Sequence, residues 1–101
     1  MKKTPEQEER EALNNLARAD QAKELLSNPL YIEAINAMQA AMFAEFEDSK
    51  LDEESKRHEL WQRMQLLKQF RGRFEHIVKT GDKAKQTLTM LQKAKQKIGI
   101  R

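Results

Sequence analysis

The hydrophobic pattern is strongest between residues 30 and 46, where only Glu33 and Glu45 carry charge. At about 100° per residue, the large apolar side chains of this stretch fill one broad arc of a helical wheel. Alanines at positions 34, 37, 40, 41 and 44 occupy most of the remaining circumference. A helix that is apolar all round is normally buried. The pattern therefore predicts a central helix that is packed on two sides.

The preceding segment predicts a first helix over residues 4–27. Its start, Thr4-Pro5-Glu6-Gln7, offers a capping threonine, a proline suited to the first helical position and a glutamine at the capping-box position. The apolar stripe of this helix is narrow and rich in alanine, so we expect it to pack against the alanine side of the central helix. The stripe consists of Leu13, Leu16, Ala19, Ala22, Leu25 and Leu26.

Asn28 and Pro29 separate the first helix from the central one. The residue before a proline avoids the α region, and Asn28 can cap the central helix with Pro29 at its first position. The pattern leaves open whether the chain turns a sharp corner here or continues through a kink.

A long helix is predicted over residues 52–80, and an acidic loop joins it to the central helix (29–47). Ser49 or Asp52 in this loop is expected to cap the N-terminus of the long helix. Its apolar seam drifts slowly backwards, which is typical of left-handed supercoiled packing and predicts an antiparallel hairpin. The seam consists of Leu60, Met64, Leu67, Phe70, Phe74, Ile77 and Val78. Gly72 within it indicates either a close helix crossing or a kink.

Thr80-Gly81-Asp82 is typical of a helix stop followed by a new cap, and predicts a separate basic helix over residues 82–98. The expected fold is therefore all-α, in a single domain of residues 1–101. It consists of an antiparallel helical hairpin, a flanking N-terminal helix and a basic C-terminal helix, in a three-to-four-helix bundle.

Charge is unevenly distributed along the chain, although the net charge is only +3. Residues 1–50 carry a net charge of −4, residues 51–78 carry +1 and residues 79–101 carry +6. The chain has no cysteine, no apolar run long enough for a membrane span, and an N-terminus that turns acidic at once. We therefore expect no disulfide, no membrane contact and no signal peptide.

The polar residues predict no catalytic, cofactor or metal site. His58 and His76 are 18 positions apart on one predicted helix, about 27 Å at 1.5 Å per residue, which is too far to share a metal ion. The serines are better explained by caps and loops, and the chain has neither a glycine-rich phosphate loop nor a nucleophile elbow. We therefore expect a protein that is not an enzyme and that binds no cofactor.

The basic C-terminal residues could neutralise nucleic-acid phosphates and give weak, sequence-blind binding to DNA. The candidate contacts for DNA or another partner are Lys83, Lys85, Lys93, Lys95, Lys97 and Arg101. The same segment has no aromatic side chain on which a base could stack. A solvated or protein-facing helix is therefore the alternative interpretation.

The central helix carries more apolar surface than two flanking helices of a short chain can cover, which predicts a homo-oligomer. The expected interface residues are Tyr31, Ile35, Met38, Met42, Phe43, Phe46 and Trp61. Trp61 lies off the seam of its helix, where it either covers the first helix or contributes to a subunit interface. Arg63 and Arg71 lie within the apolar arc, and we expect them to pair with Glu33 and Glu45 or to extend into solvent.

Short motifs follow one another between residues 17 and 85: Leu25-Leu26-Ser27-Asn28-Pro29-Leu30, Glu33-Ala34, Leu60-Trp61, Arg71 and Lys79-Thr80-Gly81. Together they resemble a pattern found in small all-helical proteins of tailed bacteriophages that are encoded near packaging and head genes. The motifs mark the ends and contacts of helices. The resemblance implies a phage context and supplies no catalytic residue.

Within that context, an oligomerising helical hairpin is similar to the oligomerisation core of small terminase subunits, which form rings and help to load DNA into the packaging motor. The chain lacks the N-terminal helix-turn-helix common in those subunits. The resemblance implies an oligomeric assembly protein in DNA packaging or virion morphogenesis. It would act with other phage proteins, in the host-cell cytoplasm or on the virion. The alternative is a structural or regulatory module that binds a phage or host protein without touching nucleic acid.

Overall fold

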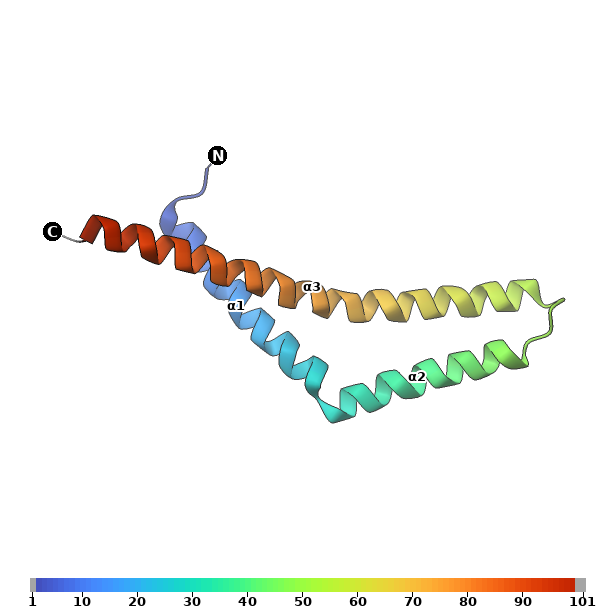
Figure 1. Cartoon of the computed structure of the whole chain (residues 1–101). Coiled ribbons are helices and arrows are strands. Elements are labelled where there is room, and N and C mark those ends of the chain that lie inside the picture. The colour runs from blue at the N-terminus through green and yellow to red at the C-terminus, as the bar shows by residue number, and fades with distance from the viewer. Residues whose placement is uncertain (1, 100–101) are drawn as a thin grey trace. The chain divides into compact units, whose positions relative to one another are not determined.

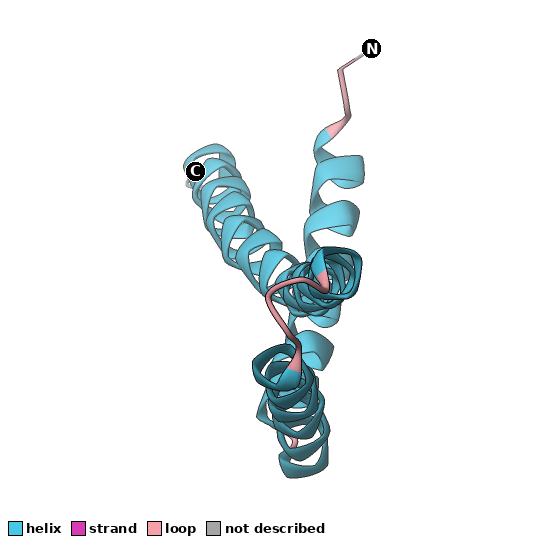
Figure 2. Ribbon diagram, turned by 90° about the vertical axis from the view of Figure 1, so that its right-hand side faces the viewer, coloured by secondary structure: helices cyan, strands magenta, loops and turns pink. Residues whose placement is uncertain are grey.

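Three helices make up the computed structural model, which describes residues 2–99. They are α1 (Pro5–Ser27), α2 (Pro29–Asp48) and α3 (Glu54–Gly99), and the described residues contain no strand (Figures 1 and 2). The all-α fold predicted from the sequence is therefore confirmed. The chain divides into two units, each of which uses a different part of α3.

The first unit, which we call the terminal unit, joins the residues up to Glu24 to those from Phe74 onward. Its core is formed by small side chains: Ala12, Ala19 and Ala22 of α1 are buried, as are Gly81 and Ala84 of α3. Small residues let two helix backbones come close, and α1 therefore packs on the C-terminal part of α3 (Figure 1). The expectation that α1 covers the alanine side of the central helix is wrong.

α3 does not stop at Gly81, where the sequence predicted its end. A Cβ atom at Gly81 would lie 2.2 Å from the Cβ of Ala19, far inside van der Waals contact. The glycine thus serves the close approach of α1 and α3, and the helix continues through it to Gly99. The separate helix predicted over residues 82–98 is part of α3. At Gly72 the expected close crossing is absent, since nothing lies within 4 Å of where its Cβ would be.

The second unit, which we call the hairpin unit, spans Leu25–Arg73 and consists mainly of α2 and the first part of α3. Ile35, Leu60 and Leu67 are its buried apolar residues. The predicted antiparallel hairpin is present, but its seam is shorter than expected. The last three seam residues lie in the terminal unit, where they are half-buried: Phe74, Ile77 and Val78.

The helix ends follow local hydrogen bonds that the sequence largely predicted. Thr4 and Gln7 form a reciprocal capping box, with backbone-to-side-chain hydrogen bonds of 3.0 and 3.2 Å. Asn28 has extended backbone angles, and its Oδ1 accepts hydrogen bonds from the N–H groups of Leu30 (2.8 Å) and Tyr31 (3.3 Å). The first helix is therefore not continuous with the central one: α1 ends at Ser27, and α2 begins at Pro29 after the cap at Asn28.

The loop between α2 and α3 uses different caps from those expected. Ser49 ends α2: its backbone N–H donates to the carbonyl of Glu45, and its Oγ donates to that of Phe46 over 2.6 Å. Glu53 precedes α3 and accepts the backbone N–H of Lys50 through its carboxylate, over 3.2 Å. α3 begins at Glu54, so Glu53, and neither Ser49 nor Asp52, occupies the position directly before its first residue.

Candidate interaction surface

The hairpin unit exposes many large apolar side chains to solvent. Phe43 on α2 is 57% exposed and Trp61 on α3 is 51% exposed. We call the exposed large apolar side chains of this unit the hairpin surface: Leu30, Ile32, Met38, Phe43, Leu51, Trp61, Leu66 and Phe70. Single exposed apolar residues are ordinary, but a concentration of them on one small unit is typical of an interaction site.

The structure divides the seven residues predicted for an oligomer interface into three groups. Met38, Phe43 and Trp61 are exposed, and are available to a partner. Ile35 is buried within the hairpin unit, so its apolar surface is used inside one chain. The remaining three are half-buried: Tyr31, Met42 and Phe46.

Sequence reasoning missed several residues of the hairpin surface. Leu66 is 64% exposed and was assigned no role, although its position off the seam of α3 was a usable signal. Phe70 was assigned to the seam but is half exposed. Both residues lie where the hairpin has only two helices, so that one side of α3 stays open.

An open groove of about 420 Å³ lies beside the hairpin surface, between α2 and α3. Gln39, Ala40 and Phe43 line it from α2, and Met64 and Leu67 line it from α3. The exposed ring of Phe43 thus forms one edge of an apolar depression. A groove with a large side chain at its edge can both accept and supply an apolar side chain.

Trp61 lies in the hairpin unit and stacks on His58, with ring centroids 6.0 Å apart and an angle of 16° between the planes. Because the indole stays half exposed, the interpretation that it covers the first helix is not supported. Near the loop, the guanidinium of Arg57 lies 4.2 Å from the centre of the Phe46 ring. Such contacts hold aromatic side chains in place at the surface.

The alanines of α2 are open as well. All five are exposed: Ala34, Ala37, Ala40, Ala41 and Ala44. The residues that were expected to accommodate the first helix therefore face no neighbour that buries them. The result is an apolar helix covered along one side only, by α3.

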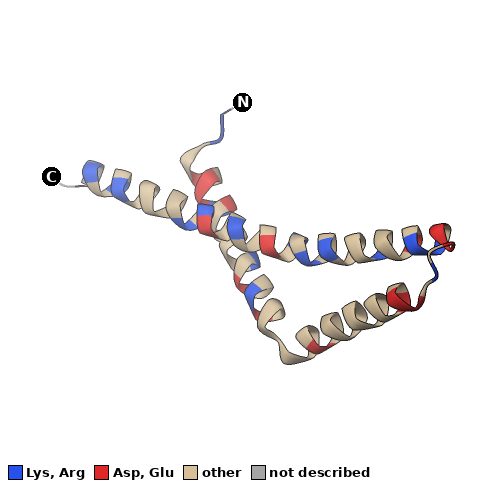
Figure 3. Cartoon of the chain, turned by 45° about the vertical axis from the view of Figure 1, so that its right-hand side comes forward, with Lys and Arg blue, Asp and Glu red and all other residues tan. Residues whose placement is uncertain are grey.

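Charge differs sharply between the two helices of the hairpin (Figure 3). α2 contains four acidic residues and no Lys or Arg, a net charge of −4. Residues 54–73 of α3 contain six Lys or Arg and two Glu, a net charge of +4. Among residues 2–99, no ion pair joins α2 to α3: Arg63 pairs with Glu59 over 2.7 Å and Lys56 with Glu53 over 3.7 Å. The predicted pairing of Arg63 with Glu33 or Glu45 is therefore wrong, and half-buried Arg71 forms no such pair either.

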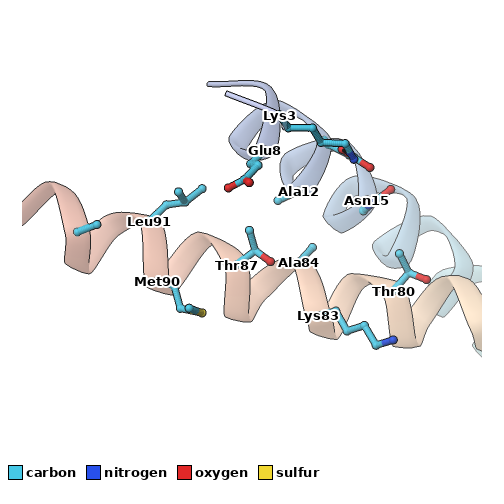
Figure 4. Close-up of a pocket in the computed structure, with 12 residues that line it drawn as sticks. Lys3, Glu8, Ala12, Asn15, Thr80, Lys83, Ala84, Thr87, Met90 and Leu91 are labelled. Atoms are coloured by element: carbon cyan, nitrogen blue, oxygen red, sulfur yellow. Dashed lines mark hydrogen bonds and ion pairs between the residues drawn. The ribbon is translucent and has the colours of Figure 1, made fainter. Parts of the chain in front are cut away.

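The terminal unit has a second groove, of about 690 Å³, between α1 and α3 (Figure 4). Ala12 and Ala84 face each other across it, and Thr87 and Leu91 point from α3 toward α1. Met90 and Lys83 lie at its edge, on the side of α3 away from α1. The groove combines a small apolar floor with a charged rim.

The candidate basic contacts lie in different surroundings. Lys95 donates to the carboxylate of Glu9 on α1 over 2.9 Å, so part of its charge is neutralised within the chain. Lys83 points away from α1 (Figure 4), and Lys85, Lys93 and Lys97 are exposed. Arg101 lies outside the described residues. The structure therefore leaves four of these lysines available to an anionic partner.

Among residues 2–99, no three His, Asp or Glu side chains come together as a metal site would require. His58 and His76 are both exposed. None of the described helices is long and apolar enough to cross a membrane.

Comparisons with known proteins add no further identification: no family model matches the chain, and no curated protein or solved structure is significantly similar to it.

Proposed function

We propose that this protein is a non-catalytic assembly protein that associates with copies of itself through the hairpin surface. The observation that carries the proposal is the apolar helix α2, which a single chain covers along one side only. Soluble helices that are apolar all round are normally buried. A second copy of the hairpin unit would cover the open side.

The exposed aromatic side chains supply part of the area that a stable contact requires. An aromatic side chain offers about 150–250 Å², and Phe43, Trp61 and Phe70 are each about half exposed. These three residues together therefore provide roughly 300 Å². The remaining members of the hairpin surface and the alanines of α2 add to this, toward the roughly 800 Å² per partner of a standard interface.

The biological setting of the proposal comes from the resemblance to small phage proteins encoded near packaging and head genes. In that setting a self-associating hairpin with an exposed basic helix would act in DNA packaging or virion morphogenesis, as small terminase subunits do. Exposed Lys85, Lys93 and Lys97 would contact the phosphate backbone without reading sequence.

A second candidate function is a module that binds another phage or host protein and does not contact nucleic acid. The ion pair between Lys95 and Glu9 favours it, because an acidic helix packed beside basic residues weakens their attraction for phosphate. The absence of aromatic residues after Phe74 points the same way.

Self-association is tested by light scattering coupled to size-exclusion chromatography. The native protein should have the mass of an oligomer at micromolar concentration, and Phe43→Glu should reduce that mass. Leu13→Glu is the matched control, because Leu13 is 52% exposed but lies on α1 in the terminal unit. A native protein that elutes as a monomer would end the proposal.

DNA contact is tested by fluorescence anisotropy with a random-sequence duplex over a salt series. Replacing Lys85, Lys93 and Lys97 by Gln should reduce the log–log salt slope by about 3, at about 0.9 per phosphate contact. The same number of neutralised basic residues elsewhere is the control: Lys2, Arg18 and Lys50. Point substitutions are preferable to removing residues 81–101, because α1 packs on that segment. A native protein that shows no binding at low salt supports the second candidate function.

A further inference from the structure

The proposed self-association leaves open which helices meet, and the charges of the hairpin unit decide between two arrangements. In the first, α2 of one copy lies on α2 of the other. In the second, α2 lies on the N-terminal part of α3 of the other copy, residues 54–73. The choice matters because the two helices carry opposite net charges of −4 and +4 (Figure 3).

In a contact between two α2 helices, all the charged side chains brought together would be acidic. Glu33, Glu45, Glu47 and Asp48 are all exposed. Packed helices lie about 8–10 Å apart, which is comparable to the Debye length of about 8 Å at physiological ionic strength. Like charges at this separation repel one another, and α2 has no basic residue with which to offset the repulsion.

Contact between α2 and residues 54–73 of α3 would instead join opposite charges. Arg63, Lys68 and Arg73 are exposed, and the described ion pairs of α3 leave the carboxylates of α2 available. Opposite charges across an interface favour the correct orientation and suppress the wrong one.

The sizes of the exposed side chains also complement each other in this arrangement. The open side of α2 is lined by alanine, whereas α3 exposes the larger side chains of Trp61 and Leu66. Large side chains pack best against small ones on the facing helix. A two-fold axis would repeat the contact, so that each copy supplies one α2 and one α3.

We infer that the partner of the hairpin surface is a second copy of this chain, with α2 of each copy seated on residues 54–73 of α3 of the other. This inference rests on the proposed self-association.

A charge-swap experiment tests the inference on the full chain. One variant carries Glu33→Lys and Glu45→Lys, and the other carries Arg63→Glu and Arg73→Glu. Each variant alone would reduce the net charge of one helix to zero and place like charges at the substituted positions of both contacts, and its dissociation constant should rise at least about tenfold. An equimolar mixture of the two variants should form a heterodimer, and a chain with all four substitutions should associate with itself again.

The salt dependence of the native protein provides a second measurement that needs no variant. Association between α2 and α3 should weaken as sodium chloride is raised, since screening reduces attraction. Association between two α2 helices should strengthen, since screening reduces repulsion. Strengthening with salt, or a mixture of the two folded variants that stays monomeric, would overturn the inference.

These outcomes are separable from failure of the proposed function. A native protein that is monomeric refutes self-association itself. A native oligomer that Phe43→Glu dissociates, but whose charge-swap mixture remains monomeric, retains the proposed function and refutes only the pairing of α2 with α3. Circular dichroism must show native helical content for each variant. If a charge reversal unfolds the chain, the Gln substitutions at the same positions replace it, and unchanged affinity of these variants at low salt refutes the pairing.

Discussion

Gly81 and Gly72 offer a matched test of the contact that holds the terminal unit together. Both glycines lie inside α3, where replacement by alanine should gain about 1 kcal/mol of helix propensity. They differ in what the added methyl group would meet. At Gly81 it would lie 2.2 Å from the Cβ of Ala19, whereas at Gly72 nothing lies within 4 Å.

The difference between the two variants therefore isolates the steric cost. Carbon atoms in contact are normally about 3.5–4.0 Å apart, so α1 and α3 would have to separate by about 1.5 Å. Overpacking of this kind costs about 1–3 kcal/mol. Each kcal/mol shifts the Tm of a domain of this size by roughly 4–8 °C. Gly81→Ala should thus melt at least roughly 4 °C below Gly72→Ala, and Gly72→Ala should melt above the native protein.

Thermal denaturation followed by far-UV circular dichroism, at one protein concentration, measures this difference. The double variant Ala19→Gly with Gly81→Ala should recover most of the loss, because the nearest remaining atoms of α1 lie 3.6–3.7 Å from the added methyl group. Equal melting temperatures for Gly81→Ala and Gly72→Ala would refute the close contact between α1 and α3.

Three further substitutions probe the helix ends and the charged contact. Asn28→Ala removes both side-chain hydrogen bonds that begin α2 and should lower the free energy of unfolding by about 1 kcal/mol in urea denaturation, whereas Asn28→Asp should retain it. Ser49→Ala removes the 2.6 Å hydrogen bond to the carbonyl of Phe46 and should cost about 1 kcal/mol in the same assay. Lys95→Gln breaks the ion pair with Glu9, and since both side chains are partly exposed it should cost less than about 1 kcal/mol, an effect that disappears in high salt. A salt-independent loss of stability for Lys95→Gln would show that the pair is not acting through charge.

Local features of this protein were determined by its sequence. The capping box at Thr4 and the cap at Asn28 depend on residues two or three positions apart, so neighbouring side chains alone specify them. The all-helical class and the hairpin follow from periodicity along the chain, which needs no knowledge of the partner helix. The excess apolar surface of α2 was also visible in advance, since its alanines and large side chains leave almost no polar face.

The tertiary structure decided the features that depend on which helices meet. Gly81 has the local appearance of a helix stop, yet α3 passes through it, and the glycine is required because α1 approaches too closely there for any side chain. The stripe of small residues on α1, which includes Ala19 and Ala22, would fit any helix with small residues on one face. In the structure it packs on α3 and not on α2. Phe70 fits the periodic seam but stays half exposed. Periodicity shows that a side chain belongs to an apolar face, but burial of that face depends on a neighbour brought there from elsewhere in the chain or from another copy.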